Sequence, residues 1–474
     1  MDALNPEQTQ AVMAAGGASP ALRALDKALK ALRLPARPTK ESLAADGRRA
    51  HALYRAGGAL LAAWPPKVKR DVAQAKAADV VKAVLRGARN AFARTYVDVI
   101  YGRVTAGYRR FVRADELVYA VAELCPGLCP TRAEVEAELQ LMHAEKDGVE
   151  IPQSDVLSHV FRHKSSGDHL MHAMLRPLPQ SVELLERFRR EGRVDLRTAH
   201  AARRGAAGHV LFNNLHHLNA EDDGTVLPLE MAADLVLLDP DLQVGVLRGN
   251  PIDRGAYKGR RVFSAGLNLT HVYHGKLSLM FYLTRDLGFV NKLYRGLAGD
   301  AYDPDGPEAT LEKPWIGALE AFAIGGGCQL LLVLDYVIAE EGSYFNLPAR
   351  KEGIIPGVAP LRMPRFLGER ASQHGILFDK TFPVNAAEAR AIVNEVVPPE
   401  RMDEAIERAA ALATGAGVIS AGANRKAIRV GQEPRDLFRR YMALYCREQA
   451  DCHFSPALIS NLERNWNAQN RPRE

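Results

Sequence analysis

Two short segments of this 474-residue chain carry backbone groups that could hold a negative charge. One reads Ser-Ala-Gly-Leu-Asn-Leu over residues 264–269, and the other reads Ala-Ile-Gly-Gly-Gly-Cys-Gln over residues 323–329. The first segment ends an apolar run and the second begins one, so a turn and a helix start could each direct an N–H group at one point. Two such donors form an oxyanion hole, which binds the oxygen of a thioester as it becomes an enolate.

The three glycines at residues 325–327 suit that chemistry. A turn that brings N–H groups against a ligand leaves no room for Cβ atoms, and a helix that begins there adds a partial positive charge. The leucine-rich run over residues 330–334 predicts such a helix. Taken alone, however, three glycines could also make only a tight turn.

Short apolar runs alternate with helical patterns from residue 209 to about residue 400. We expect strands at residues 210–212, 244–247 and 336–339, with a helix between the first two that begins after Pro228. This alternation predicts an α/β core.

The first 200 residues have a different pattern, which is rich in Ala, Arg and Leu at helical spacing. Leucines recur there at steps of three and four residues, at Leu22, Leu25, Leu29 and Leu32. Thr131 and Glu134 have the spacing of a capping box at a helix start. We therefore expect an all-helical N-terminal domain over residues 1–200, the α/β core over 201–410, and a C-terminal helical segment over 411–474.

Composition and charge indicate an ordinary globular enzyme, with 47% hydrophobic and 25% charged residues. The net charge of +6 suits an acidic ligand, for which a phosphorylated small molecule serves as well as nucleic acid. The basic run over residues 67–113 lacks the aromatic alternation of RNA-binding proteins. We interpret it as a solvated helix face and expect no nucleic-acid partner.

The sequence does not predict export or a membrane partner. The N-terminus lacks the basic and then apolar pattern of a signal peptide, and the most continuous apolar stretch, residues 330–338, is short and contains Asp335. Five cysteines in a chain of this length also argue against a disulfide scaffold. We therefore expect a cytoplasmic protein.

A series of segments, in order along the chain, resembles a known family over about residues 205–410. They are residues 218–220, 261–267, 314–327, 346–348, 353–357 and 386–389. The family that they resemble is the crotonase (enoyl-CoA hydratase/isomerase) superfamily. The resemblance implies a spiral of ββα units, a homotrimer or hexamer, and an acyl-CoA substrate. It also implies that the backbone N–H groups of Leu267 and Gly326 form the oxyanion hole.

The chain departs from the hydratases of this family at two positions. Those enzymes use one glutamate just after the Gly-Gly-Gly-Cys turn and a second just after the proline of the next strand, where this sequence has Gln329 and Ala349. Neither an amide nor a methyl group can move a proton, so ordinary hydration of an enoyl thioester is not expected. An enolate could still form, but it would have a different fate.

Further segments extend the similarity beyond the core. They are the Gly-Gly-Gly-Cys-Gln run, the long helical N-terminal region, and residues 113–119, 125–128, 169–177 and 275–278. All of them resemble the cofactor-independent (3,5-dihydroxyphenyl)acetyl-CoA dioxygenase branch of the superfamily, which acts in glycopeptide-antibiotic biosynthesis. This resemblance implies that an arylacetyl-CoA loses its α-proton and that the carbanion passes one electron to O2. The peroxide then expels coenzyme A and leaves an arylglyoxylate, without a metal or flavin cofactor.

The same resemblance assigns residues to the aryl ring and to oxygen. Glu221, Arg285 and Gln329 would hold the two phenolic hydroxyls, and Ile354 would line an apolar oxygen pocket. A carboxylate, a guanidinium and an amide can together accept from and donate to two hydroxyls. Simpler interpretations stay open, because Glu221 lies in an acidic turn, Arg285 could pair with Asp286 at the surface, and Ile354 could be a core residue.

Metal sites are the main alternative for an oxygenase. Cys125 and Cys129 lack companions at zinc-ligand spacing, so we interpret them as buried or idle thiols. Histidines lie near both sides of the first segment, at His216, His217, His271 and His274. They do not form a two-His-one-carboxylate pattern, although such iron sites can assemble from distant residues.

The sequence leaves three points open. One of these histidines could accept the α-proton. Alternatively, the aryl thioester could be acidic enough that stabilisation of its anion by the oxyanion hole accounts for most of the proton loss. The CoA phosphates could bind either of two basic groups. One group consists of Lys258, Arg260 and Arg261, and the other consists of Arg425, Lys426 and Arg429. Two other functions also remain, a conventional crotonase isomerase, hydrolase or decarboxylase, and a non-catalytic scaffold that binds an anionic partner.

Overall fold

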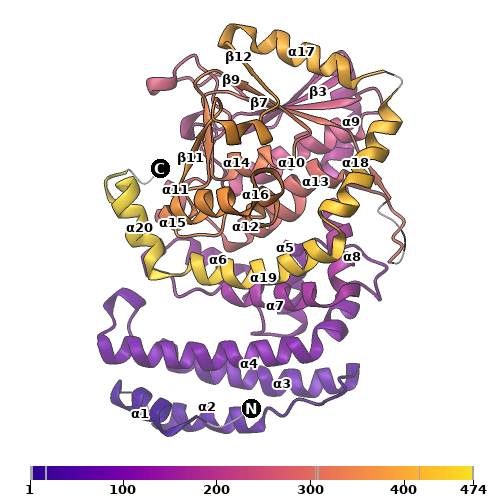
Figure 1. Ribbon diagram of the computed structural model, residues 1–474. Helices are drawn as coiled ribbons and strands as arrows, with labels where there is room; N and C mark the ends of the chain where they lie inside the picture. Colours follow the sequence, from indigo (N-terminus) through magenta and orange to yellow (C-terminus); the bar gives the residue numbers. More distant parts are fainter. Residues whose placement is uncertain (1–3, 17–18, 305, 307–308, 416, 472–474) are drawn as a thin grey trace. The chain divides into compact units, whose positions relative to one another are not determined.

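The structure is a computed structural model that describes residues 4–16, 19–304, 306, 309–415 and 417–471 (Figure 1). Residues 1–3, on which part of the signal-peptide argument rests, lie outside this range. No helix in the described part of the chain is long and apolar enough to cross a membrane. Two compact units alternate along the sequence. The first comprises Met1–Leu170, Tyr273–Met280 and Met442–Pro456, and the second comprises Met171–Val272, Phe281–Tyr441 and Ala457–Glu474.

The first unit is built from helices, as the leucine spacing predicts. Its N-terminal part contains α1 (Pro6–Ala14), α2 (Ser19–Ala31), α3 (Lys40–Ala62), α4 (Val72–Val104), α5 (Ala114–Leu124), α6 (Arg132–Leu139) and α7 (Ile151–Arg162). The four predicted leucines lie in α2 or directly after it and are buried. Thr131 and Glu134 form the predicted capping box at the start of α6.

A seven-stranded sheet forms the centre of the second unit. Its strands, in spatial order, are β1 (Arg193–Asp195), β2 (Ala199–Arg204), β3 (Ala207–Phe212), β4 (Val244–Gly249), β7 (Trp315–Leu319), β9 (Tyr336–Glu340) and β12 (Glu395–Val397). The pairs from β1 to β3 are antiparallel, and the pairs from β3 to β12 are parallel. The three predicted strands lie within β3, β4 and β9, so the predicted α/β core is confirmed.

Helices cover both faces of this sheet. Leu229 and Val236 of α10 (Asp223–Leu238) share a core with Trp315 on one face. Ile406 of α17 (Met402–Ala413) packs with Val246 and other strand residues on the opposite face. The remaining helices up to α17 are α8 (Lys164–Leu175), α9 (Pro179–Glu191), α11 (Leu269–Tyr273), α12 (Leu279–Arg285), α13 (Asn291–Arg295), α14 (Gly326–Leu331), α15 (Ala349–Glu352) and α16 (Ala359–Phe378).

Helix α10 begins earlier than the sequence predicts. Its first residue is Asp223, so Pro228 lies inside the helix instead of before it. A proline inside a helix leaves the carbonyl four residues earlier without its usual donor. Here that carbonyl belongs to Gly224 and accepts a hydrogen bond from Thr198 Oγ1 at 3.0 Å. The side chain of Asp222 caps the helix by accepting from Gly224 N, which fixes the start before the proline.

A small sheet lies beside the glycine turn. It has the order β11 (Thr381–Pro383), β10 (Tyr344–Asn346) and β8 (Phe322–Ile324), with β10 and β8 parallel. Because β8 leads into α14 and β10 leads into α15, this parallel pair brings the starts of the two helices to the same edge. A two-stranded sheet, β5 (Leu297–Ala298) and β6 (Thr310–Leu311), completes the strands of the described chain.

The C-terminal segment is helical, with α18 (Val418–Gln432), α19 (Arg435–His453) and α20 (Pro456–Trp466). Asn461 and Asn465 of α20 donate hydrogen bonds to the carbonyls of Arg350 and Lys351 in α15. Helix α20 therefore holds the short helix α15 in place. The predicted boundaries at residues 200 and 410 stay predictions, because the compact units alternate along the chain and do not follow one another.

Candidate active site

The two segments singled out in the sequence lie side by side. Ser264 and Ala323 form a parallel bridge, in which Ile324 N donates to Ser264 O at 3.0 Å and Ser264 N donates to Phe322 O at 3.3 Å. The approach is closest at Gly266. A Cβ there would lie 2.5 Å from Ile324 O and 3.1 Å from Gly326 N, which no side chain could accommodate.

The backbone around Leu267 and Gly326 leaves two N–H groups available. Glu221 N donates to Gly266 O at 2.6 Å and Asn268 N donates to Glu221 O at 2.8 Å, so in this parallel pairing the Leu267 N–H points away from Glu221. Gly326 is the first residue of α14, where an N–H group has no partner within its own helix. Neither group donates to a backbone carbonyl in the described part of the chain.

Arg285 and Glu221 form a buried ion pair next to this turn. Arg285 Nε lies 2.7 Å from Glu221 Oε2 and Nη2 lies 2.8 Å from Glu221 Oε1, while the two residues are only 4% and 1% exposed. Arg285 also donates to Gln329 Oε1 at 2.8 Å and to Gly326 O at 3.0 Å. The three residues that the family resemblance assigns to the aryl hydroxyls therefore form one network against the Gly326 backbone.

The arginine does contact Asp286, as the simpler interpretation expects, but not at the surface. Arg285 Nη1 lies 3.2 Å from Asp286 Oδ1, and Asp286 is buried. Asp286 begins a π-helix, Asp286–Val290. Such π-helical turns occur often at functional sites. Because Arg285 and Asp286 are both buried and in contact, Asp286 belongs to the same buried network as Glu221 and Gln329.

Two glycines make room for the network. A Cβ on Gly326 would lie 2.8 Å from Glu221 Oε1. A Cβ on Gly357, which has a φ of +49°, would lie 2.3 Å from Gln329 Oε1 and 2.7 Å from Asp286 Oδ2. Tyr441 holds this second turn by donating its hydroxyl to Gly357 O at 2.5 Å. A side chain at either position would therefore displace polar side chains of the network.

Comparison with known proteins gives the family of the chain. Residues 208–435 match the enoyl-CoA hydratase/isomerase family. The chain is 42% identical over 392 residues to (3,5-dihydroxyphenyl)acetyl-CoA 1,2-dioxygenase of Amycolatopsis orientalis, a match that covers 82% of this chain and 89% of that protein. The chain belongs to the enoyl-CoA hydratase/isomerase family.

Other members of this family match a shorter part of the chain. A probable enoyl-CoA hydratase of Rhizobium meliloti is 30% identical over 214 residues, which cover 44% of this chain and 73% of that protein. Among solved structures, an enoyl-CoA hydratase from Mycobacterium avium subsp. paratuberculosis is 17% identical, covers 58% of this chain and 98% of that chain, and has a TM-score of 0.46. The family match confirms the crotonase fold class that the sequence motifs predict.

Helix α15 carries the position where the family's hydratases have their second glutamate. Ala349 there is buried and has no group that could move a proton. Glu352, three residues later, is also buried, and burial together with the charge of Asp379 raises the pKa of Glu352 to about 8. Ile354 follows in the turn after α15 and is half-buried, so it is not a full core residue.

A second polar pair adjoins Glu221 in the chain. His271 Nδ1 lies 3.0 Å from Asp222 Oδ2, and Asn268 Nδ2 donates to the same oxygen at 2.9 Å. Burial raises the pKa of Asp222, but the hydrogen bonds from His271 and Asn268 outweigh it and keep that pKa below its ordinary value. The ring of His217 lies 5.2 Å from that of His271. These side chains form a polar group that sequence spacing alone did not bring together.

The two basic groups considered for the CoA phosphates differ in their surroundings. Arg425 and Arg429 both pair with Glu312, and Lys426 donates to Thr310 O. Of the other group, Arg260 pairs with Glu340 and Arg261 donates to Gly249 O. Lys258 is exposed. The group at residues 258–261 thus forms fewer internal ion pairs than the group at residues 425–429.

The described residues contain no three His, Cys, Asp or Glu side chains grouped so that they could hold a metal ion. Cys125 and Cys129 are buried free thiols, as the sequence interpretation expects. Burial raises the pKa of Cys125 to about 11, so its thiol stays protonated at neutral pH.

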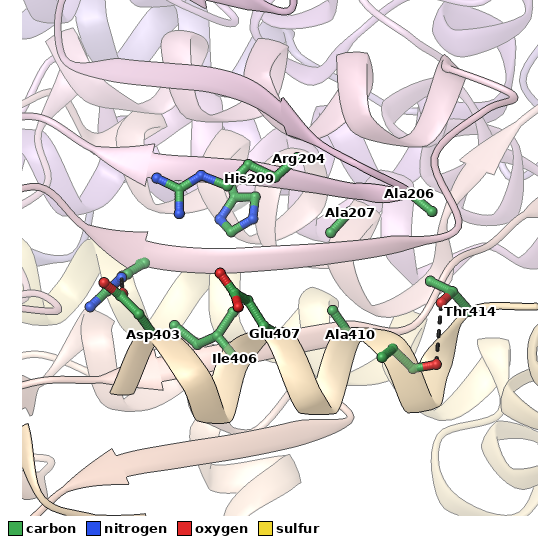
Figure 2. A pocket seen from close by; sticks show the side chains of 11 residues that line it. Arg204, Ala206, Ala207, His209, Asp403, Ile406, Glu407, Ala410 and Thr414 are labelled. Carbon is green, nitrogen blue, oxygen red and sulfur yellow. Dashed lines mark hydrogen bonds and ion pairs between the residues drawn. The ribbon is translucent and has the colours of Figure 1, made fainter. Parts of the chain in front are cut away.

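A separate cavity of about 330 Å³ lies between the main sheet and α17 (Figure 2). Figure 2 shows His209 projecting from β3 toward α17, and Glu407 projecting from α17 toward the sheet. Burial lowers the pKa of His209 to about 4, so its ring is neutral at pH 7. None of the residues assigned above to the thioester, the aryl ring or oxygen lines this cavity.

Proposed function

We propose that this protein is a cofactor-independent dioxygenase that converts (3,5-dihydroxyphenyl)acetyl-CoA and O2 to (3,5-dihydroxyphenyl)glyoxylate and free coenzyme A. The similarity to the dioxygenase of Amycolatopsis orientalis supports the reaction. The observation that carries the proposal is the buried network of Glu221, Arg285 and Gln329 against Gly326. It joins a polar recognition site to a candidate oxyanion hole.

The network can recognise two hydroxyl groups. Glu221 accepts two hydrogen bonds from Arg285 and, as a carboxylate with about four lone-pair sites, can still accept from a phenolic O–H. Gln329 uses only its oxygen toward Arg285, which leaves its amide N–H groups to donate to a hydroxyl oxygen. A site built in this way rejects a ring without hydroxyls, because its buried polar groups would then be unpaired.

The reaction begins with loss of a proton from the carbon between the ring and the thioester. The N–H groups of Leu267 and Gly326 stabilise the negative charge on the thioester oxygen, which is the role of an oxyanion hole. Ground-state O2 is a triplet, so the carbanion first transfers one electron to it, and the two radicals then combine to a peroxide at the α-carbon. Ile354 would help to keep this region apolar and free of water.

The peroxide then attacks the thioester carbonyl and expels coenzyme A as the thiolate. Loss of the second α-proton supplies the electron pair that breaks the O–O bond and leaves a ketone next to a carboxylate. Both atoms of O2 enter the product, and no external reductant is needed. We infer that the protein works in the cytoplasm as a homotrimer or hexamer, which stays a prediction from the sequence and the family.

Oxygen uptake and thiol release test the proposal together. Chelator-treated protein is mixed with (3,5-dihydroxyphenyl)acetyl-CoA, and O2 consumption and free thiol are followed in the same sample. Equal molar consumption and release is the expected result. Thiol without loss of O2 would instead support a hydrolase, and neither signal with tight binding of the thioester would support a non-catalytic scaffold.

A further inference from the structure

Helix α15 presents a second buried position one turn after Ala349. Side chains three residues apart lie on the same face of a helix. Ala349 and Glu352 are both buried, while Arg350 and Lys351 between them are exposed. The face of α15 that turns inward therefore carries a carboxyl group, although it comes from Glu352 and not from position 349.

The carboxyl group of Glu352 lies beside Gly325, the residue that precedes the Gly326 N–H of the candidate oxyanion hole. Gly325 has a φ of +50°, and a Cβ built on it would lie 3.5 Å and 3.8 Å from the two carboxyl oxygens of Glu352. The same Cβ position lies 3.9 Å from the Cα of Gly266. Gly325 directly precedes Gly326, so Glu352 lies beside the turn that supplies the Gly326 N–H, and that turn approaches Gly266, the residue before Leu267.

Among the residues that the structure describes, no Lys, Arg or His forms an ion pair with Glu352. The residue is 3% exposed, and the negative charge of Asp379 adds to the effect of burial in disfavouring its ionisation. The neighbouring cation, Arg350, lies 2.6 Å from Asp379 instead. Gly325, which lies beside this carboxyl group in the adjoining segment, has no titratable side chain. A carboxyl group in such surroundings exchanges its proton near neutral pH, as catalytic acids and bases do.

We propose that Glu352 is the group that removes the α-proton of the arylacetyl thioester, a role that rests on the proposed function. The C–H bond breaks, its proton forms an O–H bond with the Glu352 carboxylate, and its electron pair moves into the enolate held by the N–H groups of Leu267 and Gly326. No oxidant takes part in this step, so it runs without O2. The proton acceptor that the sequence leaves open is thereby assigned.

Hydrogen exchange without oxygen tests this assignment. Protein and (3,5-dihydroxyphenyl)acetyl-CoA are mixed in D2O under argon, and the NMR signal of the α-hydrogens is followed. The wild-type protein should exchange these hydrogens, with a rate that rises as the pH increases through about 8. The Glu352→Gln variant should exchange at least ~100-fold more slowly, which is the usual loss on removal of a general base. Its affinity for the thioester should change little.

Two further variants separate a chemical role from a structural one. Glu352→Asp keeps a carboxyl group and should retain more exchange than the Gln variant. Glu407→Gln makes the same change in the separate cavity of Figure 2 and should exchange like wild type. Wild-type exchange in Glu352→Gln would overturn the assignment, and a loss confined to a His271→Asn variant would give the role to His271.

The outcomes also separate this inference from the proposed function. A wild-type protein that exchanges the α-hydrogens through Glu352 but consumes no O2 would contradict the dioxygenase and leave Glu352 as the proton acceptor. Oxygen uptake that persists in Glu352→Gln would contradict only Glu352. A wild-type protein that binds the thioester with neither exchange nor oxygen uptake would overturn both.

Discussion

Arg285 donates two parallel hydrogen bonds to Glu221, from Nε at 2.7 Å and from Nη2 at 2.8 Å, at the end of α12. The pair is buried, and the remaining donors of the guanidinium reach Gln329 and the Gly326 carbonyl. The planar fork of arginine permits this arrangement, which a lysine could not reproduce. Through Arg285, the side chains proposed to select the aryl ring are hydrogen-bonded to the glycine turn at Gly326.

Selectivity for ring hydroxyls should depend on Gln329. Wild-type protein should use phenylacetyl-CoA with a kcat/KM at least ~100-fold below that for the dihydroxy substrate, because buried polar groups would be left unpaired. A Gln329→Leu variant should lose activity mainly toward the dihydroxy substrate, so the ratio of the two kcat/KM values should fall. Equal use of both thioesters by the wild-type protein would contradict the assigned role of the network.

Gly357 should tolerate no side chain. A Gly357→Ala variant would place Cβ 2.3 Å from Gln329 Oε1 and adopt a φ of +49°, so we expect kcat/KM to fall at least ~10-fold as Gln329 is displaced. Gly431→Ala provides the control, because its Cβ would meet nothing within 4 Å. Steady-state kinetics and thermal unfolding of both variants check the prediction, and an active Gly357→Ala enzyme would contradict it.

The pH dependence of stability should report the buried carboxyl group of Glu352. A group whose pKa is raised on folding stabilises the protein fully below its unfolded value of 4.5, and this contribution is lost as the pH rises through about 8. Glu352→Gln removes that loss. The melting temperature of the variant should therefore exceed that of wild type increasingly between pH 5 and about 8, as measured by calorimetry. Parallel curves would show that Glu352 ionises normally.

Glu433 should be essential for stability, since it joins three arginines. Its carboxylate lies 2.9 Å from Arg362, 3.1 Å from Arg295 and 2.8 Å from Arg365. Burial opposes its ionisation, but these guanidinium charges lower the pKa of Glu433 to about 2. The stabilisation is therefore present above pH 4.5 and is lost as the pH falls through about 2.

Removing this charge takes away the carboxylate partner of the buried Arg362. Glu433→Gln should lower the free energy of unfolding by about 3–5 kcal/mol, the usual cost of breaking a buried ion pair. Glu404→Gln makes the same change in the exposed pair with Arg401 and should leave the unfolding midpoint unchanged. Denaturant unfolding of the two variants measures the difference, and equal midpoints would contradict the role of Glu433.

The local patterns of the sequence predict much of this structure. Alternation of apolar runs predicts β3, β4 and β9, and the glycine turn at residues 325–327 leads into a helix as expected. The predicted start of α10, after Pro228, was wrong. The prediction relied on the fact that a proline usually marks the first turn of a helix. Here Thr198, which is distant in the sequence, supplies the hydrogen bond that Pro228 cannot.

The partners of the site residues could not be predicted in the same way. Glu352 and Gly325 meet because β8 and β10 pair in parallel, and no spacing in the sequence shows that pairing. Gly357 was noted only as part of a motif, whereas its contact with Gln329 gives the physical reason for glycine there. A buried glutamate on a four-residue helix has no local signal, since helical periodicity needs a longer segment.

Isotope labelling with 18O2 tests the central claim most directly. Wild-type protein is incubated with (3,5-dihydroxyphenyl)acetyl-CoA under 18O2 in unlabelled water, and the acid product is analysed by mass spectrometry. Direct attack of the peroxide on the thioester predicts an arylglyoxylate with two 18O atoms, one in the ketone and one in the carboxylate. An unlabelled arylacetic acid, or an arylglyoxylate that carries at most one 18O atom, would contradict the account.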